Sequence, residues 1–164
     1  MPDSMVLTAK LLVLLTVANT APIAVKRLLC DRWNAPLDGG LRFFDGKPLL
    51  GHSKTVRGVV AATVATLLMA PLMGFPAPTG AAVGLLSMAG DLLSSFVKRR
   101  LGIPSSGKAT GLDQVPEALL PLLVLRESLG LAPGVIAAVT LLFLALEGPV
   151  ARWSCRHGWR DTPY

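Results

Sequence analysis

Charged residues are scarce in this chain of 164 residues: Asp, Glu, Lys and Arg make up 16% of it, whereas 52% of the residues are hydrophobic. Soluble domains carry about 25% charged and about 45–50% apolar residues. Together with a mean hydropathy of +0.57, this shortage excludes an ordinary soluble protein and predicts a chain that lies in a membrane. Residues 1–164 leave room for a single membrane-embedded domain.

Cysteine and histidine are also rare, with two of each. Neither Cys30 nor Cys155 has a second Cys or His at metal-ligand spacing, which argues against a zinc site, and we expect both thiols to stay reduced. A net charge of +6 would suit nucleic acid, but the cations cluster beside apolar stretches without any groove-reading motif. Membrane topology and anionic lipid explain the basic character, so no nucleic-acid partner is expected.

Five apolar stretches are candidates for membrane-spanning helices, which need about 17–25 residues each. Arg126 and Glu127 interrupt the fourth stretch. Short connectors with Pro and Gly, at residues 76–80 and 131–134, can only join antiparallel neighbours. We therefore predict an all-α, polytopic bundle of five transmembrane helices. The stretches run from about Met5 to Val25, Gly58 to Phe75, Ala77 to Phe96, Val115 to Leu131 and Ala132 to Val150.

The distribution of Lys and Arg predicts the orientation of this bundle, because short cytoplasmic loops are enriched in cations. The two short connectors contain none, so we expect the N-terminus outside and the C-terminus inside the cell. A secretory signal peptide is the rival interpretation of the first stretch, but Asp3 stands where a basic region belongs, and we expect the stretch to be retained. The cations lie in the first long connector (Lys26, Arg27, Arg32, Arg42, Lys47, Lys54, Arg57), after the third stretch (Lys98, Arg99, Arg100, Lys108) and in the tail (Arg152, Arg156, Arg160).

The end of the third stretch combines a carboxylate, two hydroxyls and an ammonium group. Asp91, Ser94, Ser95 and Lys98 stand at i, i+3, i+4 and i+7, so they share one face of a helix that leaves the membrane. An ionisable residue inside a span is costly, which makes Asp91 a functional candidate. The alternative places Asp91 close to the interface and gives the cations that follow it only a role in stopping and orienting the span.

A second carboxylate, Asp113, stands with Gln114 at the cytoplasmic mouth of the fourth stretch. One interpretation is a helix cap, since Pro116 suits a first helical turn and Glu117 suits the positive end of a helix. The other interpretation brings Asp113 to Asp91. Two carboxylates at one membrane face, beside Lys and Arg, are suited to Mg²⁺ that holds a polyphosphate.

The first long connector contains the stretch FFDGKPLLGHSKTVRG, from Phe43 to Gly58. It does not match a P-loop, because His52 and Ser53 separate Lys54 from the preceding glycine. Glycine-rich backbone can still approach a phosphate closely, and Lys54, Thr55 and Arg57 are suitable donors to it. The alternative is a solvated loop without a ligand.

Taken together, these motifs resemble a known family. GDLLSSFVKRRLG, followed by GLDQ, is similar to the signature of the CDP-archaeol synthases, which are membrane cytidylyltransferases related to the phosphatidate cytidylyltransferases. NTAPIAVKRL and LDGGLRFFDGKPLLGHSKTVRG match the same family in order, so the resemblance covers nearly the whole chain. One departure is Pro116, which stands where family members often have another acidic residue, with Glu117 next to it.

The resemblance implies a five-span bundle with its N-terminus outside, a site on the cytoplasmic side of the cell membrane, and Mg²⁺. It implies the transfer of CMP from CTP to an isoprenoid-ether glycerol phosphate, with pyrophosphate as the second product. It also implies Asp91 and Asp113 as metal ligands and Lys98 as a catalytic cation. Further implied substrate contacts are Ser94, Ser95, Arg99 and Gln114 from the signature, and Asn19, Asp38, Asp45, Lys54, Thr55 and Arg57 from the first part of the chain.

Two alternatives remain at this point. Phosphatidate could be the acceptor, because no residue pattern distinguishes ether from ester lipids. A small transporter or channel subunit could also carry Asp91 within a span, but it would not explain why the polar motifs gather at one side of the membrane. Since a bundle of five short helices gains by pairing, we also expect a homodimer.

Overall fold

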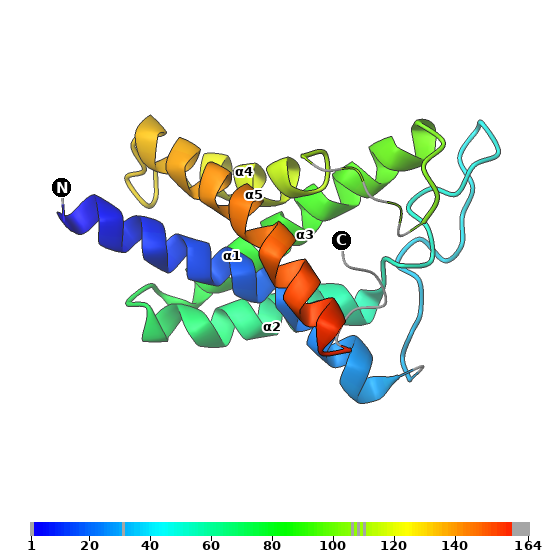
Figure 1. The fold of residues 1–164 in the computed structure, drawn as a ribbon, viewed down its shortest axis with the longest axis horizontal. Coiled ribbons are helices and arrows are strands. Elements are labelled where there is room, and N and C mark those ends of the chain that lie inside the picture. Colours follow the sequence, from blue (N-terminus) through cyan, green and yellow to red (C-terminus); the bar gives the residue numbers. More distant parts are fainter. Residues whose placement is uncertain (1, 31, 106, 108, 110, 159–164) are drawn as a thin grey trace.

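The computed structural model describes residues 2–30, 32–105, 107, 109 and 111–158, and it shows a bundle of helices (Figure 1). Within these residues, extended backbone pairs only at two isolated bridges, Pro36 with Thr55 and Arg42 with Pro48. The predicted all-α class is therefore confirmed. The helices are α1 (Pro2–Leu29), α2 (Val56–Leu72), α3 (Ala77–Arg100), α4 (Gln114–Val124) and α5 (Pro133–Arg156).

Three of these helices are long and apolar enough to cross a membrane. They are α1 with 28 residues, and α3 and α5 with 24 residues each. The apolar helices α2 and α4 have 17 and 11 residues. At a rise of about 1.5 Å per residue, α4 is about 16 Å long, which is shorter than the hydrocarbon core of a bilayer.

The fourth predicted stretch, Val115 to Leu131, is helical over only part of its length. Helix α4 ends at Val124, and turns follow it up to Gly130, whose φ is +60°. Arg126 and Glu127 are exposed in these turns. Burying charged side chains in a continued apolar helix would be costly, so the chain leaves the helix where they begin.

The apolar core lies where α1 meets the other helices. Leu11, Leu14 and Leu15 of α1 are almost completely buried, together with Val139 and Phe143 of α5. Helix α1 contacts α2, α3 and α5, while α3 lies between α2 and α4. Because these contacts join all five helices, the described chain forms one bundle around one core.

Glycines allow α3 to approach both of its neighbours closely. A Cβ atom added at Gly80 would collide with the carbonyl oxygen of Thr66 in α2, and one at Gly84 would collide with the Thr66 hydroxyl. At Gly90 a Cβ would collide with the carbonyl oxygen of Pro116 in the first turn of α4. Small residues serve the same purpose in other membrane helix pairs. The contact at Gly90 fixes α4 directly beside Asp91.

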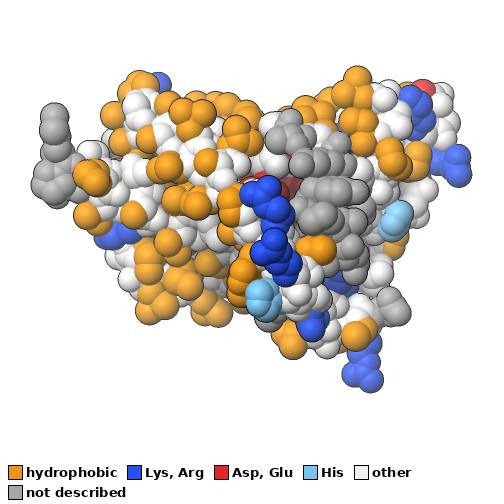
Figure 2. All heavy atoms as spheres, in the orientation of Figure 1, with side chains coloured by type: hydrophobic (Ala, Val, Ile, Leu, Met, Phe, Trp, Pro, Cys, Tyr) orange, Lys and Arg blue, Asp and Glu red, His pale blue; other side chains and the backbone are white. Residues whose placement is uncertain are grey.

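The helices alternate in direction, so the long connectors gather at one end of the bundle. The segment between α1 and α2, the segment between α3 and α4, and the end of α5 all lie opposite the N-terminus (Figure 1). Hydrophobic side chains cover most of the visible surface near the N-terminus, whereas Lys and Arg gather toward the connectors (Figure 2). Two of the cations used to predict orientation, Lys108 and Arg160, lie outside the described residues.

Candidate active site

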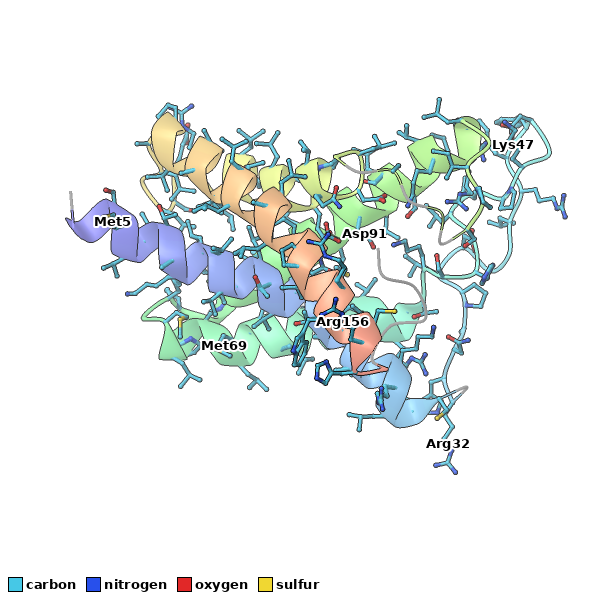
Figure 3. The ribbon with its side chains drawn as sticks, viewed as in Figure 1. Met5, Arg32, Lys47, Met69, Asp91 and Arg156 are labelled. Atoms are coloured by element: carbon cyan, nitrogen blue, oxygen red, sulfur yellow. The ribbon has the colours of Figure 1, made fainter. Side chains whose placement is uncertain are left out.

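The centre of the candidate site is an ion pair between the first connector and α3. Lys54 Nζ lies 2.7 Å from Oδ1 and 2.6 Å from Oδ2 of Asp91. Asp91 sits in the middle of the molecule, whereas Lys47 marks the outer end of the connector (Figure 3). Thr55 follows Lys54 and caps α2, because its hydroxyl accepts a hydrogen bond from the Gly58 amide at 3.2 Å. The cap holds Lys54 at the start of a rigid helix.

A cavity of about 460 Å³ opens beside this pair, and we call it the Asp91 cavity. Its walls come from α1, the first connector and the start of α2, α3, and the first turn of α4. The cavity is lined by the predicted metal ligand Asp91 and by four predicted substrate contacts, which are Asn19, Lys54, Thr55 and Arg57. Its polar lining residues include Asn19, Lys26, Lys54, Thr55, Arg57, Asp91 and Glu117.

The second predicted metal ligand, Asp113, forms a different ion pair. Its Oδ1 atom lies 2.6 Å from Nζ of Lys98, and its Oδ2 atom accepts a hydrogen bond from the Ala109 amide at 3.1 Å. Lys98 is 7% exposed and also donates to the carbonyl oxygen of Gly107 at 3.1 Å. Asp113 therefore organises the segment before α4, and it is not among the residues that line the Asp91 cavity.

The structure does not support the alternative interpretation of Asp113 as a helix cap. Asp113 occupies the N-cap position of α4, but its side chain makes no capping hydrogen bond, and its backbone is already helical. Gln114 instead accepts a hydrogen bond from the Gly111 amide at 2.5 Å. Among the described residues, no group of three His, Cys, Asp or Glu side chains is arranged to hold a metal ion.

The two serines of the signature lie inside the bundle. Ser94 and Ser95 are each 1% exposed. The Ser94 hydroxyl donates to the Gly90 carbonyl oxygen at 2.9 Å and lies 3.5 Å from the backbone oxygen of Asp113. Ser94 thus links α3 to the start of α4.

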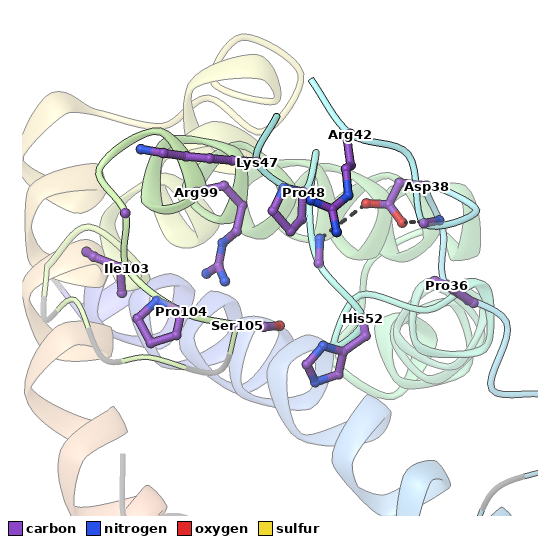
Figure 4. A pocket seen from close by; sticks show the side chains of 13 residues that line it. Pro36, Asp38, Arg42, Lys47, Pro48, His52, Arg99, Ile103, Pro104 and Ser105 are labelled. Atoms are coloured by element: carbon purple, nitrogen blue, oxygen red, sulfur yellow. Dashed lines mark hydrogen bonds between the residues drawn. The ribbon is translucent and has the colours of Figure 1, made fainter. Parts of the chain in front are cut away.

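A second cavity, of about 430 Å³, lies between the first connector and the loop after α3 (Figure 4). We call it the Arg99 cavity. Arg99 is 4% exposed, and its Nε and Nη1 atoms have no hydrogen-bond partner among the described residues. Its guanidinium group points toward Pro104 and Ser105 (Figure 4). A buried guanidinium with free donors is suited to bind a phosphate group.

The Arg99 cavity has further cationic walls, and it touches the Asp91 cavity. Arg42 and Lys47 line it on the connector side, and Gly51 brings its backbone close, with a φ of +97° that favours glycine. His52 lines both cavities. The sequence did not single out Arg42, Lys47 or His52 as ligand contacts, although each lies within two residues of a glycine of the connector, which was a usable signal.

Asp38 holds the connector in place through backbone amides. Its carboxylate accepts hydrogen bonds from Gly40 at 3.0 Å, Leu50 at 2.9 Å and Gly51 at 3.2 Å. Burial acts to raise the pKa of this carboxyl, but the amides outweigh it together and hold the pKa below its ordinary value of 3.8. Asp38 borders the Arg99 cavity, while its oxygens are engaged by the loop itself.

Arg57 holds the start of the same connector. Its guanidinium donates to the carbonyl oxygens of Cys30 at 2.8 Å and Arg32 at 2.6 Å, and to the side-chain oxygen of Asn34 at 3.2 Å. Arg57 is 9% exposed and borders the Asp91 cavity. It therefore shapes the wall of the cavity, and its donors are occupied by the chain.

Asp45 lies at the tip of the connector and lines neither of these two cavities. It pairs with Arg100 at 2.9 Å and accepts the Lys47 amide at 3.1 Å. In the described structure, Asp45 is thus bonded within the tip of the connector.

Comparison with known proteins identifies relatives of this chain. No protein-family model matches the chain. The CDP-archaeol synthase of Thermococcus gammatolerans is 30% identical over 145 residues, which cover 79% of this chain and 82% of the relative. The enzyme of the same name from Thermococcus kodakarensis is 28% identical over 163 residues, covering 90% and 89%.

A solved structure, described as an intramembrane enzyme for archaeal membrane lipids biosynthesis, has the same fold. It superposes with a TM-score of 0.68 and 32% sequence identity, and the match covers 84% of this chain and 88% of that chain. The resemblance that the signature motifs indicated is thereby confirmed. With matches of this identity over most of both chains, the chain belongs to the CDP-archaeol synthase family.

Proposed function

We propose that this protein transfers CMP from CTP to the phosphate of an archaeol-type lipid and releases pyrophosphate. The observation that carries the proposal is the pair of adjoining cavities with different chemistry. The Asp91 cavity offers carboxylates and Lys54, and the Arg99 cavity offers a buried guanidinium with free donors. The reaction brings the negative charges of a nucleoside triphosphate and a lipid phosphate together. The site must therefore bind both phosphates and neutralise the charge that develops on the departing pyrophosphate.

The acceptor needs no general base. A phosphate monoester has a second pKa of about 6, so the lipid phosphate is largely dianionic at neutral pH. One of its oxygens attacks the α-phosphorus of CTP, a new P–O bond forms there, and the bond to the bridging oxygen of the β-phosphate breaks. The electron pair leaves with pyrophosphate.

Catalysis then depends on position and on positive charge. We propose that Arg99, with its free donors in the second cavity, binds the phosphates that leave. Lys98, the residue before Arg99, is buried and pairs with Asp113. Lys54 pairs with Asp91 at the cavity that we propose for the acceptor. These cations neutralise the charge that develops on the departing group.

The donor set of this site fits a magnesium ion. Mg²⁺ prefers oxygen ligands, and at phosphoryl-transfer sites one or two carboxylates plus substrate phosphates usually hold it. We propose Asp91 as a carboxylate that serves it in the Asp91 cavity. Asp113 pairs with Lys98 outside that cavity, so it serves the same ion only if that pair opens. When bound, the ion supplies Lewis-acid neutralisation of phosphate charge.

We further propose that residues 1–164 form one domain of five membrane-embedded segments, in which α2 spans with α1, α3 and α5, and α4 spans together with the turns that follow it up to Gly130. The connectors and most cations lie at one end, which supports a cytoplasmic site with the N-terminus outside.

Cys30 and Cys155 are both free cysteines at this end, so an impermeant maleimide should label them in inside-out vesicles. Labelling only in right-side-out vesicles would reverse the orientation. Sedimentation in detergent tests the proposed homodimer.

The reaction is tested with purified protein in detergent, labelled CTP and Mg²⁺. Label should enter the lipid phase with archaetidic acid as acceptor, and a parallel reaction with phosphatidic acid measures the lipid preference. Asp91→Asn should lower the rate at least about a hundredfold, whereas Glu127→Gln, at an exposed glutamate in the turns after α4, should retain it. If no lipid takes up label from CTP with either acceptor, the proposed reaction is wrong.

A further inference from the structure

The tip of the first connector, residues 41–49, carries apolar side chains that the described chain does not cover. Phe44 is 99% exposed and Leu41 is 63% exposed. The Phe43 ring, which is also exposed, meets the Phe44 ring edge to face, with 5.1 Å between the ring centroids. A contiguous apolar patch on a surface marks a site of contact with a protein or a membrane. The tip therefore has the character of an interaction surface.

Backbone hydrogen bonds hold these side chains in a fixed arrangement. The Phe43 amide donates to the Lys47 carbonyl oxygen at 2.9 Å, and the Leu49 amide donates to the Leu41 carbonyl oxygen at 2.8 Å. Gly46 turns the chain between them with a φ of +74°, which favours glycine. The tip is thus a short hairpin that presents its apolar side chains outward.

The apolar patch of the tip joins an exposed stripe of α3. Leu85, Ala89 and Leu93 are exposed on α3 at intervals of four residues, and the half-buried Phe96 follows three residues later. Residues at this spacing share one face of a helix. The Phe43 ring packs edge to face against the Phe96 ring, with 5.4 Å between the centroids. Because α3 is long and apolar enough to cross a membrane, its exposed stripe is suited to face lipid, and Phe43 connects the tip to that stripe.

Cations flank the apolar side chains of the tip. Arg42 and Lys47 are exposed. The guanidinium group of Arg100, at the end of α3, lies 4.7 Å from the ring centroid of Phe43 and 4.9 Å from that of Phe96. Figure 2 shows hydrophobic side chains over the outer end of α3, with Lys and Arg side chains at their edge. Aromatic and apolar residues beside Lys and Arg are typical of segments that lie in the interface of an anionic bilayer.

We propose that the tip of the connector inserts into the bilayer leaflet on its side of the bundle, with its apolar side chains among the lipids and its cations at the lipid phosphates. The partner is a membrane surface that carries anionic lipids. Contact with the stripe of α3 favours lipid over a protein partner, because the same bilayer then covers both surfaces. Arg42 and Lys47 also line the Arg99 cavity, so an inserted tip holds that cavity at the membrane surface. The inference goes beyond the proposed reaction and does not depend on it.

Spin labels on cysteine variants test where the tip lies, in protein reconstituted into vesicles of phosphatidylcholine and anionic phosphatidylglycerol. The two native cysteines are first replaced by serine, so that Phe44→Cys carries the only label. Collisions of the label with oxygen, which concentrates in the bilayer, are compared with collisions with a water-soluble nickel chelate. Leu93→Cys, on the stripe of α3, is the bilayer reference. Ala35→Cys is the control, because Ala35 is an exposed residue of the same connector outside the tip.

The Phe44→Cys label should resemble the Leu93→Cys label, and its nickel collisions should be at least about threefold rarer than those of the Ala35→Cys label. In vesicles of phosphatidylcholine alone, this protection should weaken, because the cations of the tip lose their anionic partners. Protection of equal size in both kinds of vesicle would overturn the part of the proposal that concerns anionic lipids.

Nickel collisions as frequent for the Phe44→Cys label as for the Ala35→Cys label would overturn the proposal as a whole. If Phe44→Cys does not fold, Leu41→Cys replaces it and is judged by the same comparison, since Leu41 is also exposed at the tip. No substrate enters this experiment. Failure of the proposed reaction would therefore leave its result unchanged, and failure of the tip to insert would leave the proposed reaction standing.

Discussion

The two walls of the Asp91 cavity are built by different kinds of interaction. The helical wall is formed by α1, α2, α3 and α4, and glycines of α3 let its backbone touch those of α2 and α4. The connector wall, residues 32–55, has only two isolated bridges and is held by Asp38, Arg57 and Arg100, which bond to backbone groups of the connector. Close packing is indifferent to pH and salt, whereas hydrogen bonds from charged groups respond to both. The site thus joins a rigid wall to one that responds to conditions.

The largest loss of stability is expected at the glycine contacts of the helical wall. Gly80→Ala places a methyl group against the carbonyl oxygen of Thr66, and the helices must separate, at a cost of about 3 kcal/mol. Gly148→Ala is the control, because a Cβ there meets open space. Thermal unfolding in detergent measures both. Equal unfolding temperatures for the two variants would show that α2 and α3 are not in close contact.

In the connector wall, the largest effect is expected at Arg57. Arg57→Met removes a charged donor from the carbonyl oxygens of Cys30 and Arg32, which should cost about 2 kcal/mol. We expect the connector to become sensitive to protease while the helices stay resistant. Arg42→Met is the control, since Arg42 is exposed and donates only to the Gly46 carbonyl oxygen among the described bonds, at 3.0 Å. Equal rates of cleavage for the two variants would contradict the role of Arg57.

The connector wall should also depend on pH through Asp38. Since its folded-state pKa lies below the ordinary value of 3.8, its stabilisation is complete above that value and is lost as the pH falls through the folded-state pKa. Asp38→Asn should cost about 1.5 kcal/mol at neutral pH. The difference in unfolding temperature from the wild type should be constant down to about pH 5 and disappear in stronger acid. A difference that already shrinks between pH 7 and 5 would contradict this assignment.

The smallest effect is expected at the tip of the connector. Asp45→Asn breaks the ion pair with Arg100. Because Asp45 is exposed, we expect the free energy of unfolding to fall by less than about 0.5 kcal/mol. Arg100 keeps its contacts with the rings of Phe43 and Phe96, at 4.7 and 4.9 Å. Arg100→Met should therefore destabilise the tip more than Asp45→Asn in the same thermal assay. The reverse order would mean that the ion pair matters more than the ring contacts.

Much of this architecture could be predicted from the sequence, because it follows from local patterns. Apolar stretches and their Pro- and Gly-containing connectors predicted all five helices, and spacing alone put Asp91 and Lys98 on one helix. Only the length of α4 differs from the prediction, because the helix ends at Val124, before Arg126 and Glu127. The signature motifs also indicated the family, since they occur in order along the chain.

The partners of the charged residues could not be predicted in the same way. The sequence placed Asp91 and Asp113 together, but the structure gives each carboxylate a lysine of its own, Lys54 and Lys98. It also turned Asp38 and Arg57, which were expected at the substrate, toward the backbone of the connector.

By itself, the sequence determined the helices, their alternation and the end of the bundle where the polar residues gather, because hydrophobic periodicity and turn residues act locally. Only the tertiary structure decided which charges meet. Such pairs join segments 15 to 37 residues apart, and a shift of one helical residue rotates a side chain by about 100°. The contact of Gly90 with Pro116 selects the rotation that brings Glu117 to the cavity of Asp91.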